Sequence, residues 1–277
     1  MTRVLVFGSS HVAAIVLGWP RVQPEFPSVS LDFLAAQQPV IDCMRRGKGD
    51  LFGLLAPGEI DPRRVALVDQ MSVARTVHLD DYDHVLRVGA NIGVAAMQDL
   101  LTGFIVDGLR EIDPPSPVPR LSTALFRALC ADVVQATLAE NRFERFQGSR
   151  VTVLPRPRLS ELWADQGDDH VNLARSLREM PQGILAALDV FEDICAGTLA
   201  GKGLQYCRQP SETVGSFGFT RQEFSRGNVS MRADRPDMRA TDLHHMNPDY
   251  GAICLRAALR LVLAAGSGQS EAQVRTG

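Results

Sequence analysis

The sequence lacks the patterns that mark several common classes of protein. Its five cysteines are widely scattered and form no C-x-x-C pair, so they indicate neither a zinc site nor a disulfide framework. No apolar stretch is long enough for a transmembrane helix. The formal net charge of -3 is small, which argues against a protein that binds nucleic acid through its phosphates. We therefore expect a cytoplasmic protein with reduced cysteines that binds neither nucleic acid nor membrane.

A secretory signal peptide is not indicated either. Arg3 precedes an apolar run, but Gly8-Ser9-Ser10-His11 interrupts that run, and no clear small-residue cleavage site follows before Trp19. The chain has 277 residues, of which 45% are hydrophobic and 22% charged, enough to bury a substantial core. We expect a single domain over residues 1–265, followed by a small, polar and disordered tail over 266–277.

Apolar runs typical of strands alternate along the chain with helical patterns. The predicted strands cover residues 4–7, 29–34, 84–88 and 151–154, a short run at 65–68 also fits a strand, and the predicted helices cover 12–18, 121–140, 184–191 and 250–265. This alternation predicts an α/β fold with a central parallel sheet between layers of helices. Residues 156–230 fit it less well, and we expect them to form a rim or cap that selects the substrate.

The first strand leads into a glycine turn and two serines, Gly8-Ser9-Ser10. A serine at that point lies at the amino end of the next helix, where free N–H groups favour negative charge. It could equally be an N-cap. A dinucleotide fingerprint would need glycine in place of Ser10, although Asp32 lies near the usual position of its ribose-binding acid. The nucleophile elbow G-x-S-x-G fails because Val12 replaces its second glycine.

Two further segments carry polar groups at places where sites form. Asn91 follows a predicted strand between Gly89 and Gly93, as a turn residue or as a donor at the sheet's carboxyl edge. Asp242 and His245 precede the last helix, which Asn247-Pro248 is expected to open. At that separation the carboxylate can hold the imidazole in one tautomer, leaving its other nitrogen as a base. Ordinary helix capping is the alternative, and a metal site with His11 and His244 lacks a diagnostic ligand spacing.

The three segments occur together and in order, and in this respect the sequence resembles the SGNH (GDSL-like) hydrolases. The resemblance implies a flavodoxin-like three-layer α/β/α fold and an esterase without cofactor or metal. It implies Ser10 as nucleophile, His245 as general base, Asp242 as the partner of His245, and Asn91 with the Ser10 N–H as oxyanion donors.

Two departures from the family pattern concern the turn and the oxyanion site. Ser9 stands where the family has aspartate, and the glycine of the family's second block has two candidates, Gly47 and Gly49, of which Gly49 is our choice. His11 and His244 are expected near the substrate.

The expected activity is hydrolysis of an acetyl or short-acyl ester, such as one on a small molecule or a carbohydrate, through an acyl-enzyme. Acyl transfer to another alcohol by the same residues, and a glycan-binding protein without catalysis, remain alternatives.

Overall fold

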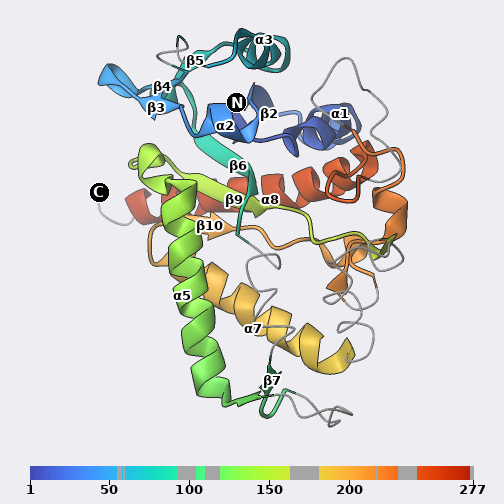
Figure 1. Ribbon diagram of the computed structural model, residues 1–277. Coiled ribbons are helices and arrows are strands. Elements are labelled where there is room, and N and C mark those ends of the chain that lie inside the picture. The colour runs from blue at the N-terminus through green and yellow to red at the C-terminus, as the bar shows by residue number, and fades with distance from the viewer. Residues whose placement is uncertain are drawn as a thin grey trace.

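The computed structural model describes residues 1–54, 58, 60–92, 104–109, 119–162, 181–215, 218–229 and 242–274 (Figure 1). Its strands are β1 (Thr2–Gly8), β2 (Val29–Ala35), β3 (Arg45–Arg46), β4 (Leu51–Gly53), β5 (Thr76–His78), β6 (His84–Ala90), β7 (Ile105–Val106), β8 (Arg120–Leu121), β9 (Val151–Pro155) and β10 (Leu204–Tyr206). Its α-helices are α1 (Val12–Val22), α2 (Gln38–Ile41), α3 (Pro62–Met71), α5 (Thr123–Asn141), α7 (Pro181–Ala200) and α8 (Pro248–Val274).

Five parallel strands form the central sheet in the order β10-β9-β6-β1-β2. Numbered along the chain, these strands lie in the order 2-1-3-4-5, which is the flavodoxin-like order. The chain reverses direction across the sheet between β1 and β6, and open α/β sheets bind ligands at such a switch point. The predicted α/β fold with a parallel sheet is confirmed at this level.

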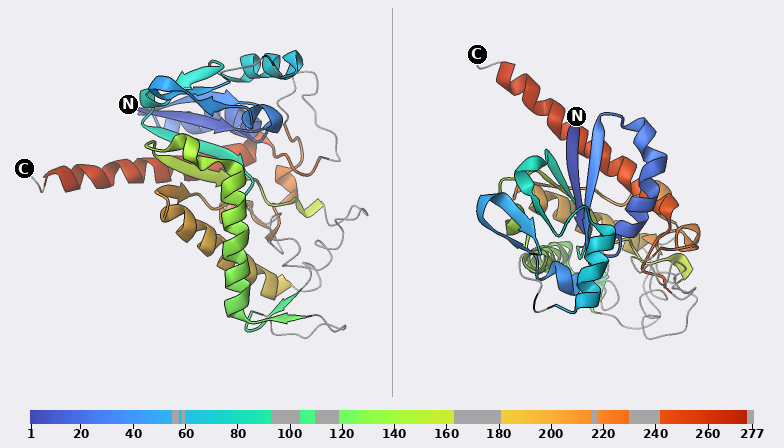
Figure 2. Two further views of the ribbon diagram at one scale, coloured as in Figure 1. Left: turned by 60° about the vertical axis from the view of Figure 1, so that its left-hand side comes forward. Right: turned by 90° about the horizontal axis from the view of Figure 1, so that it is seen from above.

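Helices cover both faces of the sheet (Figure 2). Along β1, Val4 and Val6 face one core with α1 and α8, whereas Leu5 and Phe7 face a second core with α3, α5 and α7. This alternation is what a strand buried on both faces requires, and the arrangement is compatible with a three-layer sandwich. In the part of the chain that the structure describes, no helix combines the length and apolar character needed to cross a membrane.

Several elements differ from their predictions for identifiable reasons. The run at 65–68 is not a strand but part of α3, which begins where Asp61 accepts a hydrogen bond from the Arg63 N–H and Pro62 occupies the first helical position. Strand β10 was not predicted, because its short run in a glycine-rich stretch shows no clear period. Helix α8 continues past Ala265 to Val274, where a disordered tail was predicted, and Glu271, Ala272 and Gln273 are good helix formers.

Candidate active site

The candidate site lies at the carboxyl edge of the two central strands. Ser10 belongs to the turn between β1 and α1, where the Val12 and Ala13 N–H groups donate to the Ser9 and Ser10 carbonyls. Asn91 follows β6 directly. Because β1 and β6 pair in parallel, with Gly8 opposite Val88, their loops emerge side by side at the switch point.

Two glycines allow these loops to approach each other. A Cβ on Gly8 would lie 2.3 Å from the Val88 carbonyl oxygen. Gly89 has a φ of +69°, and a Cβ there would lie 2.8 Å from His11 Cδ2 and 2.9 Å from Ser9 Oγ. A side chain at either position would push the Ser10 turn away from β6.

His245 lies in the loop that opens α8. Asn247 caps this helix, since its Oδ1 accepts a hydrogen bond of 3.0 Å from the Tyr250 N–H, and Pro248 is its first residue. The predicted cap and proline start are therefore confirmed.

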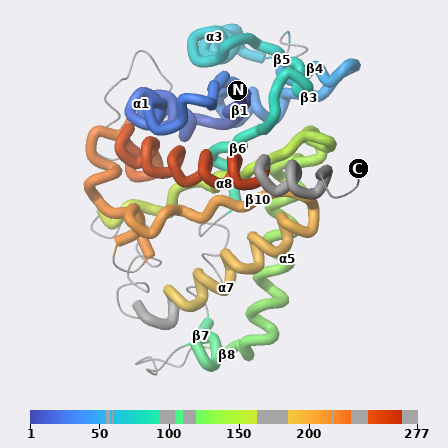
Figure 3. The backbone as a smooth tube through the Cα atoms, turned by 180° about the vertical axis from the view of Figure 1, so that it is seen from behind, coloured from blue at the N-terminus to red at the C-terminus, as the bar shows by residue number. Residues whose placement is uncertain are grey.

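Helix α8 packs against α1 at backbone distance, and the two run side by side across one face of the sheet (Figure 3). A Cβ on Gly251 would lie 2.0 Å from the Ala14 carbonyl oxygen, and one on Gly18 would lie 2.5 Å from the Ala252 nitrogen. Gly18 therefore serves this contact, whereas the sequence predicted that it ends α1, which instead continues through Pro20 to Val22. Because Ser10 precedes α1 and His245 precedes α8, the helix contact fixes the two side chains relative to each other.

Ser10, His245 and Asp242 form a hydrogen-bonded chain. Ser10 Oγ lies 2.6 Å from His245 Nε2, and His245 Nδ1 lies 2.8 Å from Asp242 Oδ2. The other carboxylate oxygen, Asp242 Oδ1, accepts the backbone N–H groups of His244 at 3.0 Å and of His245 at 3.1 Å. Ser10, His245 and Asp242 are all partly exposed, so a reactant can reach the Ser10 hydroxyl.

The environment of Asp242 favours its ionised form. Partial burial by itself would raise the pKa of this carboxyl, but the hydrogen bond and charge of His245 and the two backbone N–H groups outweigh burial and lower the pKa to about 2. An ionised Asp242 requires a proton on His245 Nδ1, which leaves Nε2 as the acceptor for the Ser10 hydroxyl. The arrangement can activate a serine oxygen as a nucleophile.

Comparison with known proteins found no matching family model, no matching curated protein and no matching solved structure. The inferences below therefore depend on the geometry of this molecule and on its sequence motifs.

Asn91 lies beside the chain and is held by two neighbours. Its Oδ1 accepts a hydrogen bond of 3.2 Å from Arg156 Nη1, and its backbone N–H donates at 3.1 Å to Asn141 Oδ1 at the end of α5. The Asn91 Nδ2 group remains as a donor at the edge of the cavity. The structure thus brings Asn91 together with Ser10 and His245, as the motifs predicted, while the neighbouring Gly93 lies outside the described residues.

The two other predicted histidines differ in their surroundings. His11 is buried, and its ring stacks on that of His245 with centroids 5.0 Å apart. Burial foremost, followed by the neighbouring His245 and Arg156, lowers the pKa of His11 well below its usual value, so this ring is neutral. His244 is exposed and does not line the cavity that contains Ser10.

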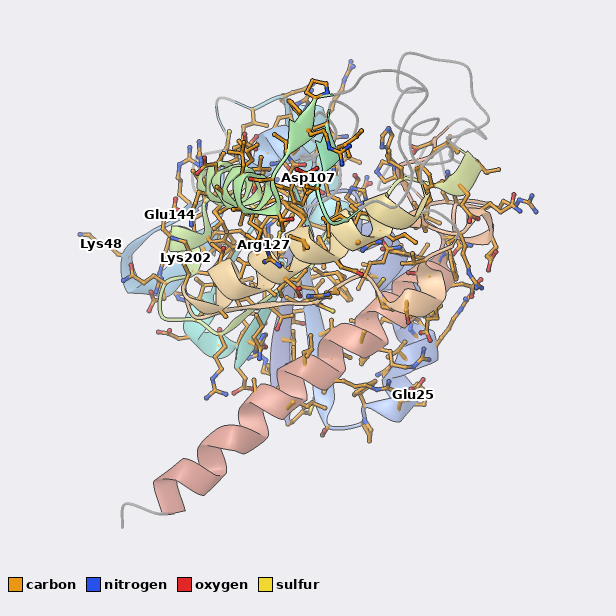
Figure 4. All side chains as sticks on the ribbon, turned by 90° about the horizontal axis from the view of Figure 1, so that it is seen from below. Glu25, Lys48, Asp107, Arg127, Glu144 and Lys202 are labelled. Atoms are coloured by element: carbon orange, nitrogen blue, oxygen red, sulfur yellow. The ribbon has the colours of Figure 1, made fainter. Side chains whose placement is uncertain are left out.

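Gly49 does not join the site. It lies in the turn between β3 and β4 with a φ of +63°, where its carbonyl accepts a hydrogen bond from His78 Nδ1. Its neighbour Lys48 points away from the body of the protein (Figure 4). Neither Gly49 nor Gly47 lines the cavity, so the structure gives neither glycine contact with the candidate oxyanion site. The positive φ explains Gly49 as turn chemistry.

The cavity has a volume of about 730 Å³ and a lining with both polar and apolar surface. The described lining residues are Ser9, Ser10, His11, Gln38, Asp42, Gly89, Asn91, Ala139, Glu140, Asn141, Arg142, Arg156 and His245. Sequence reasoning missed Gln38, Asp42, residues 139–142 and Arg156. A signal for Arg156 was present, because it lies two residues after the predicted strand 151–154, much as Asn91 lies three residues after the predicted strand 84–88.

Part of the predicted rim holds the His245 loop in place. The Asn247 side chain donates to the Glu223 and Arg226 carbonyls at 2.9 and 3.0 Å. The Asn247 N–H donates at 2.7 Å to the Phe224 carbonyl, and the Val229 N–H donates at 3.3 Å to the Met246 carbonyl. Residues 222–229 therefore support the loop that carries Asp242 and His245.

Among the described residues, no group of three or more His, Cys, Asp or Glu side chains could hold a metal ion.

Proposed function

We propose that this protein is a serine esterase that hydrolyses an acetyl or short-acyl ester of a polar alcohol, such as a carbohydrate, through an acyl-enzyme. The observation that carries the proposal is the continuous chain from Ser10 Oγ to His245 at 2.6 Å and from His245 to Asp242 at 2.8 Å. The motif order and the flavodoxin-like strand order support assignment to the SGNH hydrolases.

In the proposed mechanism Ser10 Oγ attacks the ester carbonyl while its proton passes to His245 Nε2. The resulting imidazolium is stabilised by ionised Asp242, and the oxyanion accepts hydrogen bonds from Asn91 Nδ2 and the Ser10 N–H. His245 then gives the proton to the departing alcohol, which leaves Ser10 acylated. A water molecule then attacks the acyl carbonyl while His245 Nε2 takes its proton. The bond from the acyl carbon to Ser10 Oγ breaks, the carboxylic acid leaves, and His245 returns the proton to Ser10 Oγ.

The lining of the cavity supports the substrate class. Seven of its thirteen described residues carry a carboxamide, carboxylate or guanidinium group, and Ala139 and Gly89 are the two without a polar side chain. Hydroxyl groups of a sugar-like alcohol can pair with such side chains, whereas a long acyl chain would leave them without hydrogen-bond partners. We therefore expect acetyl esters to be turned over faster than octanoyl esters of the same alcohol.

The first experiment is intact-mass analysis after treatment with a fluorophosphonate, which reacts with activated serines. The wild type should gain one adduct, Ser10→Ala should gain none, and Ser9→Ala, which removes the adjacent hydroxyl, should still react. Labelling of Ser10→Ala, or an unlabelled but folded wild type, would refute the proposal.

With 4-nitrophenyl acetate, Asn91→Ala should reduce turnover roughly 100-fold if its amide binds the oxyanion.

A further inference from the structure

Arg156 is a cation in the cavity whose described partners are neutral. It follows β9 at the carboxyl edge of the sheet and lines the cavity with Ser10 and Asn91. Its Nη1 donates at 3.2 Å to Asn91 Oδ1, and its Nε lies 3.4 Å from His11 Nε2. Within the described part of the chain, none of the ion pairs involves Arg156.

The contact with Asn91 decides which end of that amide faces the cavity. The two ends of a carboxamide have nearly the same shape, but one accepts hydrogen bonds and the other donates them. A guanidinium group can only donate, so the Asn91 oxygen must face Arg156. The N–H2 end of Asn91 then faces away from Arg156, and it is the end that can donate a hydrogen bond to the oxyanion of the proposed mechanism.

The second contact of Arg156 is with His11, whose ring is neutral. His11 Nε2 is the acceptor facing Arg156, and the His11 ring stacks on His245. Burial lowers the pKa of Arg156, yet the guanidinium remains charged at neutral pH. Its positive charge thus lies beside both the amide and the histidine stack.

We propose that Arg156 is a positioning residue that orients the Asn91 amide for oxyanion binding. This inference rests on the proposed esterase function. Arg156 lies outside the sequence motifs, and it would hold the side chain of the motif residue Asn91 in the orientation that binds the oxyanion. Because the effect passes through Asn91, removal of Arg156 should lower the rate of acylation without weakening substrate binding.

The test is a double-mutant cycle with 4-nitrophenyl acetate. Arg156→Ala should lower kcat about 10-fold or more, with KM changed less than about 3-fold. In the Asn91→Ala background the same substitution should change kcat less than about 2-fold, because the residue through which it acts is already gone. Arg156→Lys, which keeps a charge and a donor but loses the planar fork, should recover part of the loss.

Arg142→Gln is the matched control. This second guanidinium lines the same cavity, but it donates at 3.0 Å to the Asp42 carbonyl instead of contacting Asn91. Its effect should be the same in both backgrounds. Independent effects of Arg156→Ala and Asn91→Ala, or a rise in KM with kcat unchanged, would overturn the role of Arg156. Thermal melting of each variant checks the fold, and fluorophosphonate labelling of Ser10 separates failure of this inference from failure of the proposed function.

Discussion

The two sides of the cavity are built by different means. On the serine–histidine side, which we define as Ser10, His245 and Asp242, the reacting groups lie at the ends of α1 and α8, whose backbones are in direct contact. On the amide side, defined as Asn91, Asn141 and Arg156, side-chain hydrogen bonds of 3.1 and 3.2 Å make the connections.

The two kinds of contact differ in how tightly they fix the groups that they join. A backbone contact between helices has no room for a methyl group, so it fixes the distance between Ser10 and His245 to within the stiffness of the core. A side-chain hydrogen bond contributes about 1 kcal/mol and can be replaced or lost without unfolding the chain. We expect substitutions on the first side to abolish activity or stability, and those on the second to change the rate.

The largest effect is expected from Asp242→Asn. The amide can face His245 Nδ1 with a donor, which favours the tautomer in which Nε2 can no longer accept the Ser10 proton. Turnover of 4-nitrophenyl acetate should fall about 10⁴-fold with little loss of structure. The control is Asp249→Asn on the exposed first turn of α8, where a surface contact with Arg21 is lost, and its turnover should stay within roughly 2-fold of wild type. A loss of turnover below about 10-fold for Asp242→Asn would contradict the proposed role of Asp242 in holding the His245 tautomer.

Gly251→Ala tests the backbone contact itself. The added Cβ would lie 2.0 Å from the Ala14 carbonyl oxygen, so α1 and α8 must separate. The free energy of unfolding, measured in urea, should fall by about 3 kcal/mol or more. Gly197→Ala is the matched control, since a Cβ at this exposed position in α7 meets nothing within 4 Å. That change should stabilise the protein by about 0.5–1 kcal/mol, because alanine is the better helix former. Equal effects of the two substitutions would mean that the helix contact does not position the site.

The sequence and the structure agree best where a local pattern has one physical solution. The apolar run at 4–7 can hardly be anything but a buried strand, and Asn247-Pro248 begins a helix because a cap and a fixed φ act within one turn. The proximity of Ser10, Asn91 and His245 was predictable because parallel strands bring their carboxyl ends to one edge.

The failures concern contacts that no local pattern records. Gly18 looked like a helix end, yet it serves the approach of α8 from the far end of the chain. Gly49 looked like an oxyanion donor by its place in the motif order, yet it lies in the turn between β3 and β4, which pair in the separate antiparallel sheet β3-β4-β5. Arg156 and Asn141 join the cavity through side chains that reach across between elements, and the order of residues does not specify such reach.

Of the two sides of the cavity, only the serine–histidine side should make the free energy of unfolding depend on pH in the acid range. The pKa of Asp242 is lowered from 3.8 to about 2 in the folded protein, so its ionised form stabilises the fold above pH 4, and this stabilisation disappears as the pH falls toward 2. The contribution is on the order of 2 kcal/mol. The gap in unfolding free energy between wild type and Asp242→Asn should therefore narrow over that range. The corresponding gap for Asn141→Ala, which removes an amide that does not titrate, should stay constant, and a parallel narrowing of both gaps would contradict the assignment.

The smallest effect is expected from Asn141→Ala, which loosens the amide side without touching any group that reacts. It removes the acceptor for the Asn91 N–H and the bond from Asn141 Nδ2 to the Thr137 carbonyl, so Asn91 keeps only its contact with Arg156. Turnover should fall roughly 10-fold while the free energy of unfolding changes by about 1 kcal/mol.

Arg127→Gln, on the exposed face of the same helix α5, is the control and should leave both quantities near wild type. Unfolding measurements in urea and kinetics with 4-nitrophenyl acetate decide the outcome together. If Asn141→Ala destabilised the protein as much as Gly251→Ala, the amide side would be as much a part of the rigid core as the helix contact. If turnover were unchanged, Arg156 alone would hold Asn91, and the amide side would reduce to that single pair.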